Sequence, residues 1–132
     1  MGNDDITLIT DVILCNSSTN AITVTTDDGR NPARKSYTSH YIREIPYRPE
    51  RSKVFLFRYY PKDVNNGYRK SDNLSKWEIA HEFGHVLGIG DYYTSYRNQT
   101  FRSIMNRTYD PVTDADVSKL LEVIKKGEYV RW

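Results

Sequence analysis

Residues 80–91 read Ala-His-Glu-Phe-Gly-His-Val-Leu-Gly-Ile-Gly-Asp, and this stretch decides how the rest of the chain is interpreted. Its two histidines are four residues apart. On an α-helix that spacing leaves ~40° of rotation and ~6 Å of rise between two side chains. Both imidazole rings therefore project from one helix face. Glu82 is displaced around the helix axis, so its carboxylate lies beside the point where the rings converge.

Two histidine nitrogens at this spacing can each approach a zinc ion at about 2.0–2.1 Å. A catalytic zinc site usually has three protein ligands and keeps its fourth position for water. Gly88 can adopt the positive φ that turns a chain out of a helix, which would bring Asp91 back toward the metal. The prediction is a zinc ion held by His81, His85 and Asp91, with Glu82 as the general base.

Other acidic residues compete with Asp91 for the third ligand position, namely Asp110, Asp114 and Asp116. The last two fall in the first turn of a predicted helix, where carboxylates cap free backbone N–H groups. Asp91 is therefore preferred. His40, the remaining histidine, lies in a predicted loop with no partner at ligand spacing, and we expect it to be a surface residue.

The pattern His-Glu-x-x-His-x-x-Gly-x-x-Asp at residues 81–91 resembles the signature of the metzincin zinc peptidases, with aspartate replacing their usual third histidine. That variant is characteristic of the snapalysin-like peptidases. Residues 103–106, Ser-Ile-Met-Asn, resemble the methionine turn of metzincins, which implies that Met105 forms an apolar floor under the histidines without binding the metal. The resemblance also implies that a tyrosine assists the oxyanion: Tyr93, two residues after the aspartate, with Tyr109 as the competitor.

Residues 80–121 also resemble metallopeptidase toxin modules at the carboxyl ends of bacterial polymorphic toxins. They share the Ala-His-Glu-Phe-Gly-His start, the Ser-Ile-Met-Asn turn and a closing Val-Thr-Asp-Ala-Asp-Val helix. The resemblance implies a zinc endopeptidase that acts on a protein or peptide substrate, is secreted or delivered into a target cell, and has a cognate inhibitor protein. A small secreted degradative peptidase and a non-catalytic, zinc-stabilised binding module are the alternatives.

Upstream of the histidine helix the sequence predicts strands and loops. Runs of β-branched residues predict strands over residues 6–14 and 21–26, joined as a hairpin. Another strand is predicted over residues 53–60, whereas residues 30–52, with three prolines, are predicted to be mostly loop. The strand over 53–60 precedes the histidine helix as the upper edge strand does in metzincins, so an extended substrate could pair with it. An ordinary strand inside the sheet is equally compatible with the sequence.

Two helices are predicted in the second half of the chain. One begins at residues 71–73, ends at Gly88, and carries apolar residues at helical spacing. These are Leu74, Trp77, Ile79, Ala80, Phe83, Val86 and Leu87. The other begins near Thr113 and ends at Gly127, with an apolar face made by Val117, Leu120, Leu121 and Ile124.

The expected architecture is a single α+β domain spanning residues 1–132, a length typical of one domain. Strands and loops are expected over residues 1–72, the zinc helix and its turn over 73–91, and the methionine turn with the C-terminal helix over 92–132. We expect a metzincin-like domain in which a short mixed sheet of about three or four strands packs on the two helices.

Composition limits the class of partner. A hydrophobic fraction of 38% with 27% charged residues is typical of a folded globular chain, and a net charge of +2 is too small to favour nucleic acid. No apolar segment approaches the roughly 20 residues needed to cross a bilayer. The first residues do not form a secretory signal. We expect a monomer with no nucleic-acid partner and no membrane span.

Overall fold

The computed structural model describes residues 21–27, 35–61, 67–69, 72–93, 101–106 and 111–132. It contains strands, one short 3₁₀ helix and two α-helices. In chain order these are β1 (Thr23–Asp27), β2 (Tyr37–Ser39), the 3₁₀ helix Pro49–Arg51, β3 (Lys53–Phe57), β4 (Tyr59–Pro61), β5 (Gly67–Arg69), α1 (Asp72–Val86) and α2 (Asp114–Lys126).

The main sheet has three strands in the order β1-β3-β2. β1 runs parallel to β3 with Val24 opposite Val54, and β2 runs antiparallel to β3 with Thr38 opposite Val54. β4 and β5 form a separate antiparallel pair. The predicted α+β class with a short mixed sheet is therefore confirmed.

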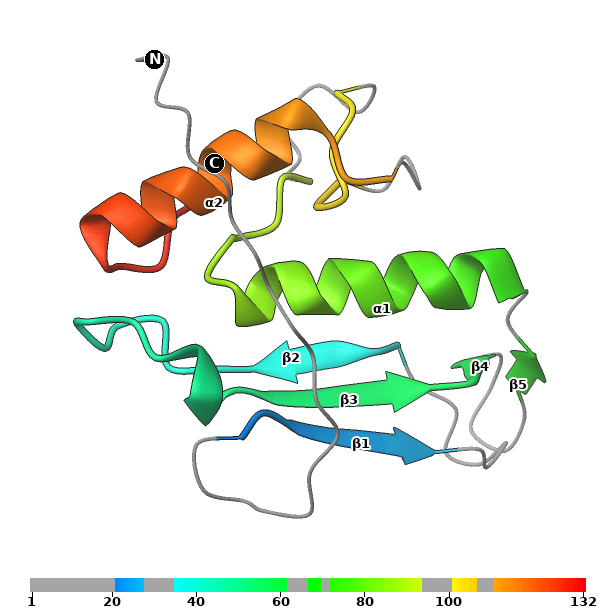
Figure 1. The fold of residues 1–132 in the computed structure, drawn as a ribbon. Coiled ribbons are helices and arrows are strands. Elements are labelled where there is room, and N and C mark those ends of the chain that lie inside the picture. The colour runs from blue at the N-terminus through cyan, green and yellow to red at the C-terminus, as the bar shows by residue number, and fades with distance from the viewer. Residues whose placement is uncertain (1–20, 28–34, 62–66, 70–71, 94–100, 107–110) are drawn as a thin grey trace.

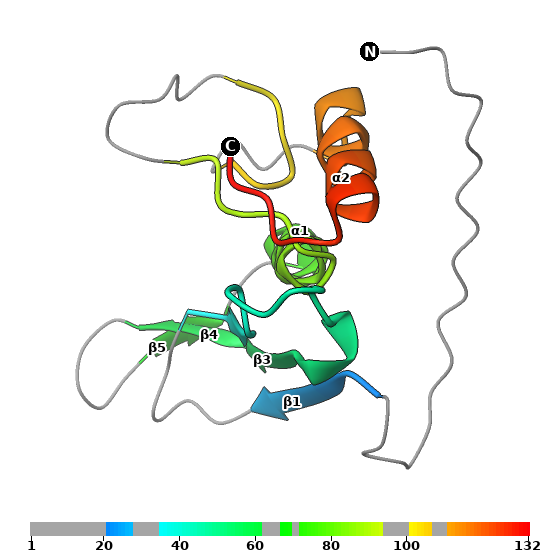
Figure 2. The same ribbon diagram turned by 90° about the vertical axis from the view of Figure 1, so that its left-hand side faces the viewer.

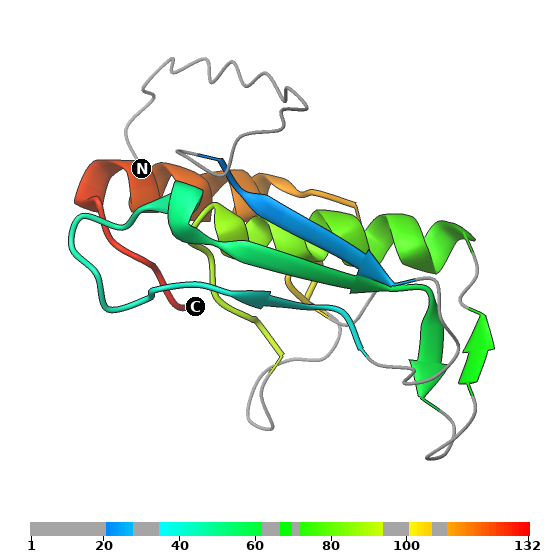
Figure 3. The same ribbon diagram turned by 90° about the horizontal axis from the view of Figure 1, so that it is seen from below.

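The elements are stacked in layers. α1 lies across one face of the main sheet, and α2 lies on the opposite side of α1 (Figure 1). Seen along α1, the sheet is below this helix and α2 is above it (Figure 2). The other face of the sheet carries none of the described helices (Figure 3). α1 is thus packed on two sides, which explains why even its polar side chains can be buried.

The hydrophobic core lies mainly between α1, α2 and the segments that follow α1. Its buried members are Ile89, Ile104, Met105, Val123 and Val130. These residues come from the turn after α1, the predicted methionine turn, α2 and the C-terminal segment. The core therefore holds together the parts of the chain that carry the predicted site.

Both α-helices end where the sequence predicts. α1 is followed by Gly88 with φ +97°, where a Cβ would lie 2.8 Å from a methyl carbon of Val123. α2 follows the N-cap Thr113, whose backbone N–H donates to the Asp116 carboxylate at 2.8 Å, and it ends at Gly127 with φ +67°. Only glycine tolerates these left-handed turns at low cost.

Several strand predictions need correction. The predicted strand over residues 6–14, and its hairpin, lie outside the described residues, whereas β1 confirms the strand predicted over residues 21–26. The single strand predicted over residues 53–60 is two strands, separated at Arg58. β2 interrupts the region predicted to be mostly loop. Its three residues are too few to give a periodic pattern, so the sequence did not predict it. β3 is central, so of the two interpretations of this strand the ordinary sheet strand holds and the edge for substrate does not; β1 and β2 are the outer strands.

The predicted apolar face of α2 is also partly wrong. Val117 and Ile124 are 48% and 54% exposed, while Asp116 and Val123 are buried with Leu120 between them. The prediction considered apolar residues alone, whereas the inward face of α2 includes the buried carboxylate of Asp116. On α1, Ile79 is similarly exposed.

Within the described part of the chain, neither α-helix combines the length and the apolar character that crossing a membrane requires.

Candidate metal centre

Three potential ligand atoms converge where α1 meets the turn that follows it. His81 and His85 come from α1, and Asp91 comes from the turn. The Asp91 Oδ1 atom lies 3.1 Å from Nε2 of His81 and 3.0 Å from Nε2 of His85. Ligand atoms about 2.0–2.1 Å from a tetrahedral zinc ion would be ~3.3 Å apart. This group of residues could therefore hold a metal ion.

Backbone carbonyls orient both histidine rings. Nδ1 of His81 lies 2.9 Å from the carbonyl oxygen of Ile104, and Nδ1 of His85 lies 2.9 Å from that of Ile89. A carbonyl only accepts, so each Nδ1 carries the proton and donates it. Each Nε2 is then directed to the common point, where it can bind a metal or share a proton with Asp91. This arrangement is usual for histidine ligands of metals.

The charges within the group compensate one another. Burial by itself would raise the pKa of Asp91, but hydrogen bonds from His81 and His85, with their positive charge, hold this pKa well below its ordinary value. Burial by itself would lower the pKa of His85, but its hydrogen bond and attraction to Asp91 raise it. The carboxylate is therefore ionised, and a bound cation would take over the stabilising role of the histidine protons.

The C-terminal segment fixes the turn that carries Asp91. Ile89 and Val130 form a parallel β-bridge, in which the Gly90 N–H donates to the Val130 carbonyl at 2.9 Å. The Val130 N–H donates to the Gly88 carbonyl at 2.8 Å, and the Trp132 indole N–H donates to the Gly90 carbonyl at 2.9 Å. The sequence pattern did not predict this contact. The only local signal was the short alternation of apolar and polar residues after Gly127.

Glu82, the predicted base, is buried beside the ligand group. It is 5% exposed, and its negative charge contributes to the raised pKa of His85. Thr38 of β2 donates a hydrogen bond to Glu82 Oε2 at 2.6 Å. This contact leaves Oε1 as the other acceptor of the carboxylate. The role of Thr38 was not foreseen, because β2 itself was not.

Met105 lies directly against α1 between the two histidine positions. It is fully buried, and a Cβ placed on Gly84 would overlap its Sδ atom. The absence of a side chain at Gly84 therefore lets the sulfur approach the helix backbone. This packing places Met105 against α1 at Gly84, which lies between His81 and His85 in the sequence.

The structure places the other predicted residues as follows. Tyr93 lies beside His81, with ring centroids 5.9 Å apart and planes inclined by 19°. Asp114 is exposed on α2, and the buried Asp116 is engaged by backbone groups, so neither joins the ligand group. Tyr109 and Asp110 lie outside the described residues.

The expectation that His40 is a surface residue holds only in part. It is half-buried at the end of β2, with its ring centroid 5.8 Å from that of His85. Nδ1 of His40 lies 3.2 Å from the Tyr47 hydroxyl. Burial, followed by the positive charge of His85, lowers the pKa of His40 to about 4, so this imidazole is neutral at pH 7. His40 lies beside His85 without joining the ligand group.

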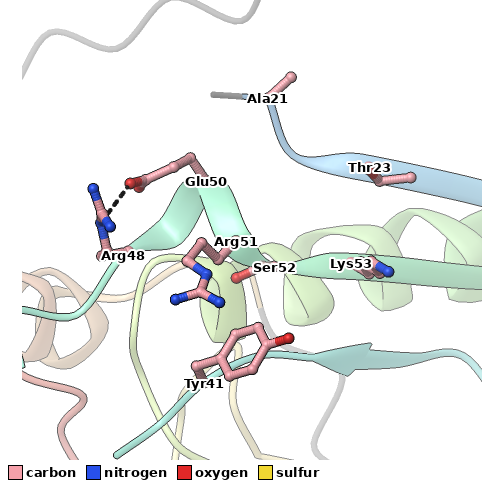
Figure 4. A pocket seen from close by; sticks show the side chains of 8 residues that line it. All are labelled: Ala21, Thr23, Tyr41, Arg48, Glu50, Arg51, Ser52 and Lys53. Atoms are coloured by element: carbon pink, nitrogen blue, oxygen red, sulfur yellow. Dashed lines mark hydrogen bonds and ion pairs between the residues drawn. The ribbon is translucent and has the colours of Figure 1, made fainter. Parts of the chain in front are cut away.

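A surface hollow of about 390 Å³ lies elsewhere, at the starts of β1 and β3 (Figure 4). Its lining contains no residue of the ligand group. Two of its basic side chains are already paired: Arg48 with Glu50 at 3.1 Å, and Arg51 with Glu44 at 2.8 Å. The hollow is lined by Ala21, Thr23, Tyr41, Arg48, Glu50, Arg51, Ser52 and Lys53.

No family model, curated protein or solved structure matches this chain. The arrangement of its own residues is therefore the basis for assigning a function.

Proposed function

We propose that this protein is a zinc-dependent endopeptidase, with the metal held by His81, His85 and Asp91 and with Glu82 as general base. The observation that carries the proposal is the convergence of the three ligand atoms beside a buried carboxylate. The two imidazole nitrogens and one carboxylate oxygen form a donor set that suits zinc.

The composition of the site favours catalysis over a purely structural metal. Structural zinc sites normally use four protein ligands, whereas catalytic sites use three and leave a position open. Among the described residues, the group at ligand distance consists of His81, His85 and Asp91. Glu82 lies next to this group without belonging to it. Burying a charge is costly unless it is both paired and hydrogen-bonded. The hydrogen bond from Thr38 meets only part of this requirement, and a general base gives a reason to keep the carboxylate beside the ligand group, whereas a non-catalytic binding module does not.

In the proposed mechanism each polar residue around the metal has a separate role. Zinc, when bound, supplies a Lewis acid that activates water and polarises the peptide carbonyl. Glu82 accepts a proton from the attacking water at Oε1, since Thr38 occupies Oε2. It then delivers this proton to the leaving amine. Tyr93, beside His81, is the proposed donor to the developing oxyanion.

The position of β2 supports a polypeptide substrate. β2 is one of the two outer strands of the main sheet, and among the described residues it pairs only with β3. An extended peptide can add to such an edge by backbone hydrogen bonds. Because Thr38 of β2 contacts Glu82 directly, a peptide paired to this strand would pass close to the general base.

The proposal predicts cleavage of unfolded polypeptide that depends on metal. Zinc-loaded protein incubated with a mixture of denatured proteins should yield internal fragments, identified by mass spectrometry through their new termini. A chelator should stop the cleavage and added zinc should restore it. Chelated protein that cleaves equally well, or zinc-loaded protein that leaves all the polypeptides intact, would contradict the proposal.

Thr38→Val is predicted to lower kcat by about tenfold, a fraction of the ~10²–10⁴-fold that general acid–base catalysis contributes. Valine keeps the shape of threonine but leaves Glu82 without its hydroxyl partner. Zinc affinity and KM should change little, which separates a positioning effect from loss of the site. Ser36→Ala is the matched control, because Ser36 bonds Glu78, one turn earlier, at 2.7 Å. Equal kcat losses in both variants would refute a specific role for Thr38.

A further inference from the structure

Asp116 has contacts that helix capping does not explain. It is 3% exposed in the first turn of α2. The Thr113 N–H donates to Oδ2 at 2.8 Å, which is an ordinary helix-cap contact. The Thr113 hydroxyl also donates to Oδ2, at 3.0 Å. Two further contacts reach the predicted methionine turn: Ser103 Oγ donates to Oδ1 at 2.5 Å, and the Ile104 N–H donates to Oδ2 at 2.9 Å. The carboxylate therefore joins the start of α2 to the segment beneath the histidines.

A chain of hydrogen bonds continues from Asp116 to a proposed metal ligand. Ser103 Oγ, which donates to Asp116, accepts the Met105 N–H at 2.9 Å. That N–H belongs to the same peptide group as the Ile104 carbonyl. The carbonyl oxygen accepts the Nδ1 proton of His81 at 2.9 Å. Every donor in the chain points toward the carboxylate, so each bond polarises the next in the same sense.

We propose that Asp116 is a positioning residue for the metal centre, acting on His81 through Ser103 and the Ile104–Met105 peptide group. Its negative charge makes the Ile104 carbonyl a stronger acceptor. His81 then keeps its proton on Nδ1 and presents Nε2 to the metal in a fixed orientation. Hydrogen-bond partners behind a ligand histidine commonly fix its orientation in this way and so raise its affinity for the metal. The inference rests on the metal centre of the proposed function, and it adds a buried carboxylate to it.

The second histidine has no such partner, which gives an internal comparison. Nδ1 of His85 bonds to the Ile89 carbonyl, whose peptide group includes the Gly90 N–H. That N–H donates to the carbonyl of Val130 at 2.9 Å. This chain therefore passes to a neutral backbone group of the C-terminal segment and not to a carboxylate. A substitution of Asp116 should change the Nδ1 hydrogen bond of His81 and leave that of His85 unchanged.

The test compares Asp116→Asn with Asp114→Asn. Asparagine keeps the shape of the side chain and an oxygen that can accept the Thr113 and Ile104 N–H groups. It removes the charge and opposes the Ser103 O–H with an amide donor. Asp114 lies in the same turn of α2 but is exposed, so its variant makes the same charge change away from the chain of hydrogen bonds.

Two readouts are needed, and neither depends on peptidase activity. Competition with a chelating dye should show zinc binding weakened by roughly 10–100-fold in Asp116→Asn and unchanged in Asp114→Asn. In metal-free protein, nitrogen–proton NMR of the histidines should show the Nδ1 proton of His81 shifted upfield or lost to exchange. The corresponding proton of His85 should keep its position.

Ser103→Ala tests the same chain without removing the charge. It breaks the link between Asp116 and the Met105 N–H, while the Ile104 and Thr113 N–H groups keep their acceptor. Its effects on zinc affinity and on the His81 proton should resemble those of Asp116→Asn. The double variant should bind zinc no more weakly than the weaker-binding single variant, because both substitutions interrupt the same chain of hydrogen bonds.

The inference is overturned if folded Asp116→Asn binds zinc as tightly as the wild type, or if the His81 and His85 protons shift equally. If Asp116→Asn does not fold, the same readouts on Ser103→Ala decide. Failure of the proposed function looks different. If the wild type binds zinc but cleaves no peptide, the proposed function fails, and the difference in zinc affinity between the wild type and Asp116→Asn is still expected. A wild type that binds no metal removes the metal centre, and the NMR comparison still shows whether Asp116 holds His81.

Discussion

Glu82→Gln is expected to lower peptide turnover by ~10²–10⁴-fold, the range that a general base contributes. Glutamine keeps the size of the side chain and can still accept the hydrogen bond from Thr38, but it cannot take a proton from water. Zinc affinity should remain close to that of the wild type, because Glu82 lies outside the ligand group. Steady-state kinetics on a cleaved peptide, with zinc titration in parallel, measures both quantities.

Glu78→Gln is the matched control for this experiment. Glu78 lies one turn earlier on α1, and its carboxylate also accepts a hydrogen bond from a hydroxyl group, that of Ser36. Its substitution should leave turnover within a few-fold of the wild type. Near-wild-type turnover in Glu82→Gln would remove this residue as the base. The same pair tests the toxin setting implied by sequence resemblance, since cells should tolerate Glu82→Gln and be harmed by the wild type and by Glu78→Gln.

Asp91→Ala is expected to weaken zinc binding by more than ~100-fold, beyond the range found for partners behind a ligand. The substitution removes one of the three ligand atoms and leaves two imidazoles without an anionic partner. Turnover should fall with zinc occupancy. Isothermal titration or dye competition measures the change, and Asp114→Ala, an exposed aspartate of α2, is the control. Wild-type zinc affinity in a folded Asp91→Ala variant would assign the third ligand to another residue.

The ligand group was predictable because its geometry is local. Helical spacing alone places the rings of His81 and His85 on one face. Gly88, with its positive φ, then turns the chain within a few residues, so that Asp91 returns to the same point. All of these residues lie in one short segment, and the rules that govern their positions do not depend on the rest of the fold.

The groups that support the site were not predictable, because distant segments bring them there. Thr38 bonds a residue 44 positions away, and it comes from a strand too short for a sequence pattern. Asp116 was correctly expected to cap α2, but its burial and its contact with Ser103 depend on how α2 packs. Val130 supports the Asp91 turn through a parallel bridge that no local rule anticipates.

The central claim is that His81, His85 and Asp91 hold one metal ion per chain. Elemental analysis of the purified wild type, beside His85→Ala and His40→Ala, tests it most directly. His40 is the matched control, because its ring lies next to His85 but outside the ligand group. The account predicts one zinc per chain in the wild type and in His40→Ala, and none retained in His85→Ala. A folded wild type without tightly bound metal, or equal zinc content in all three proteins, would contradict it.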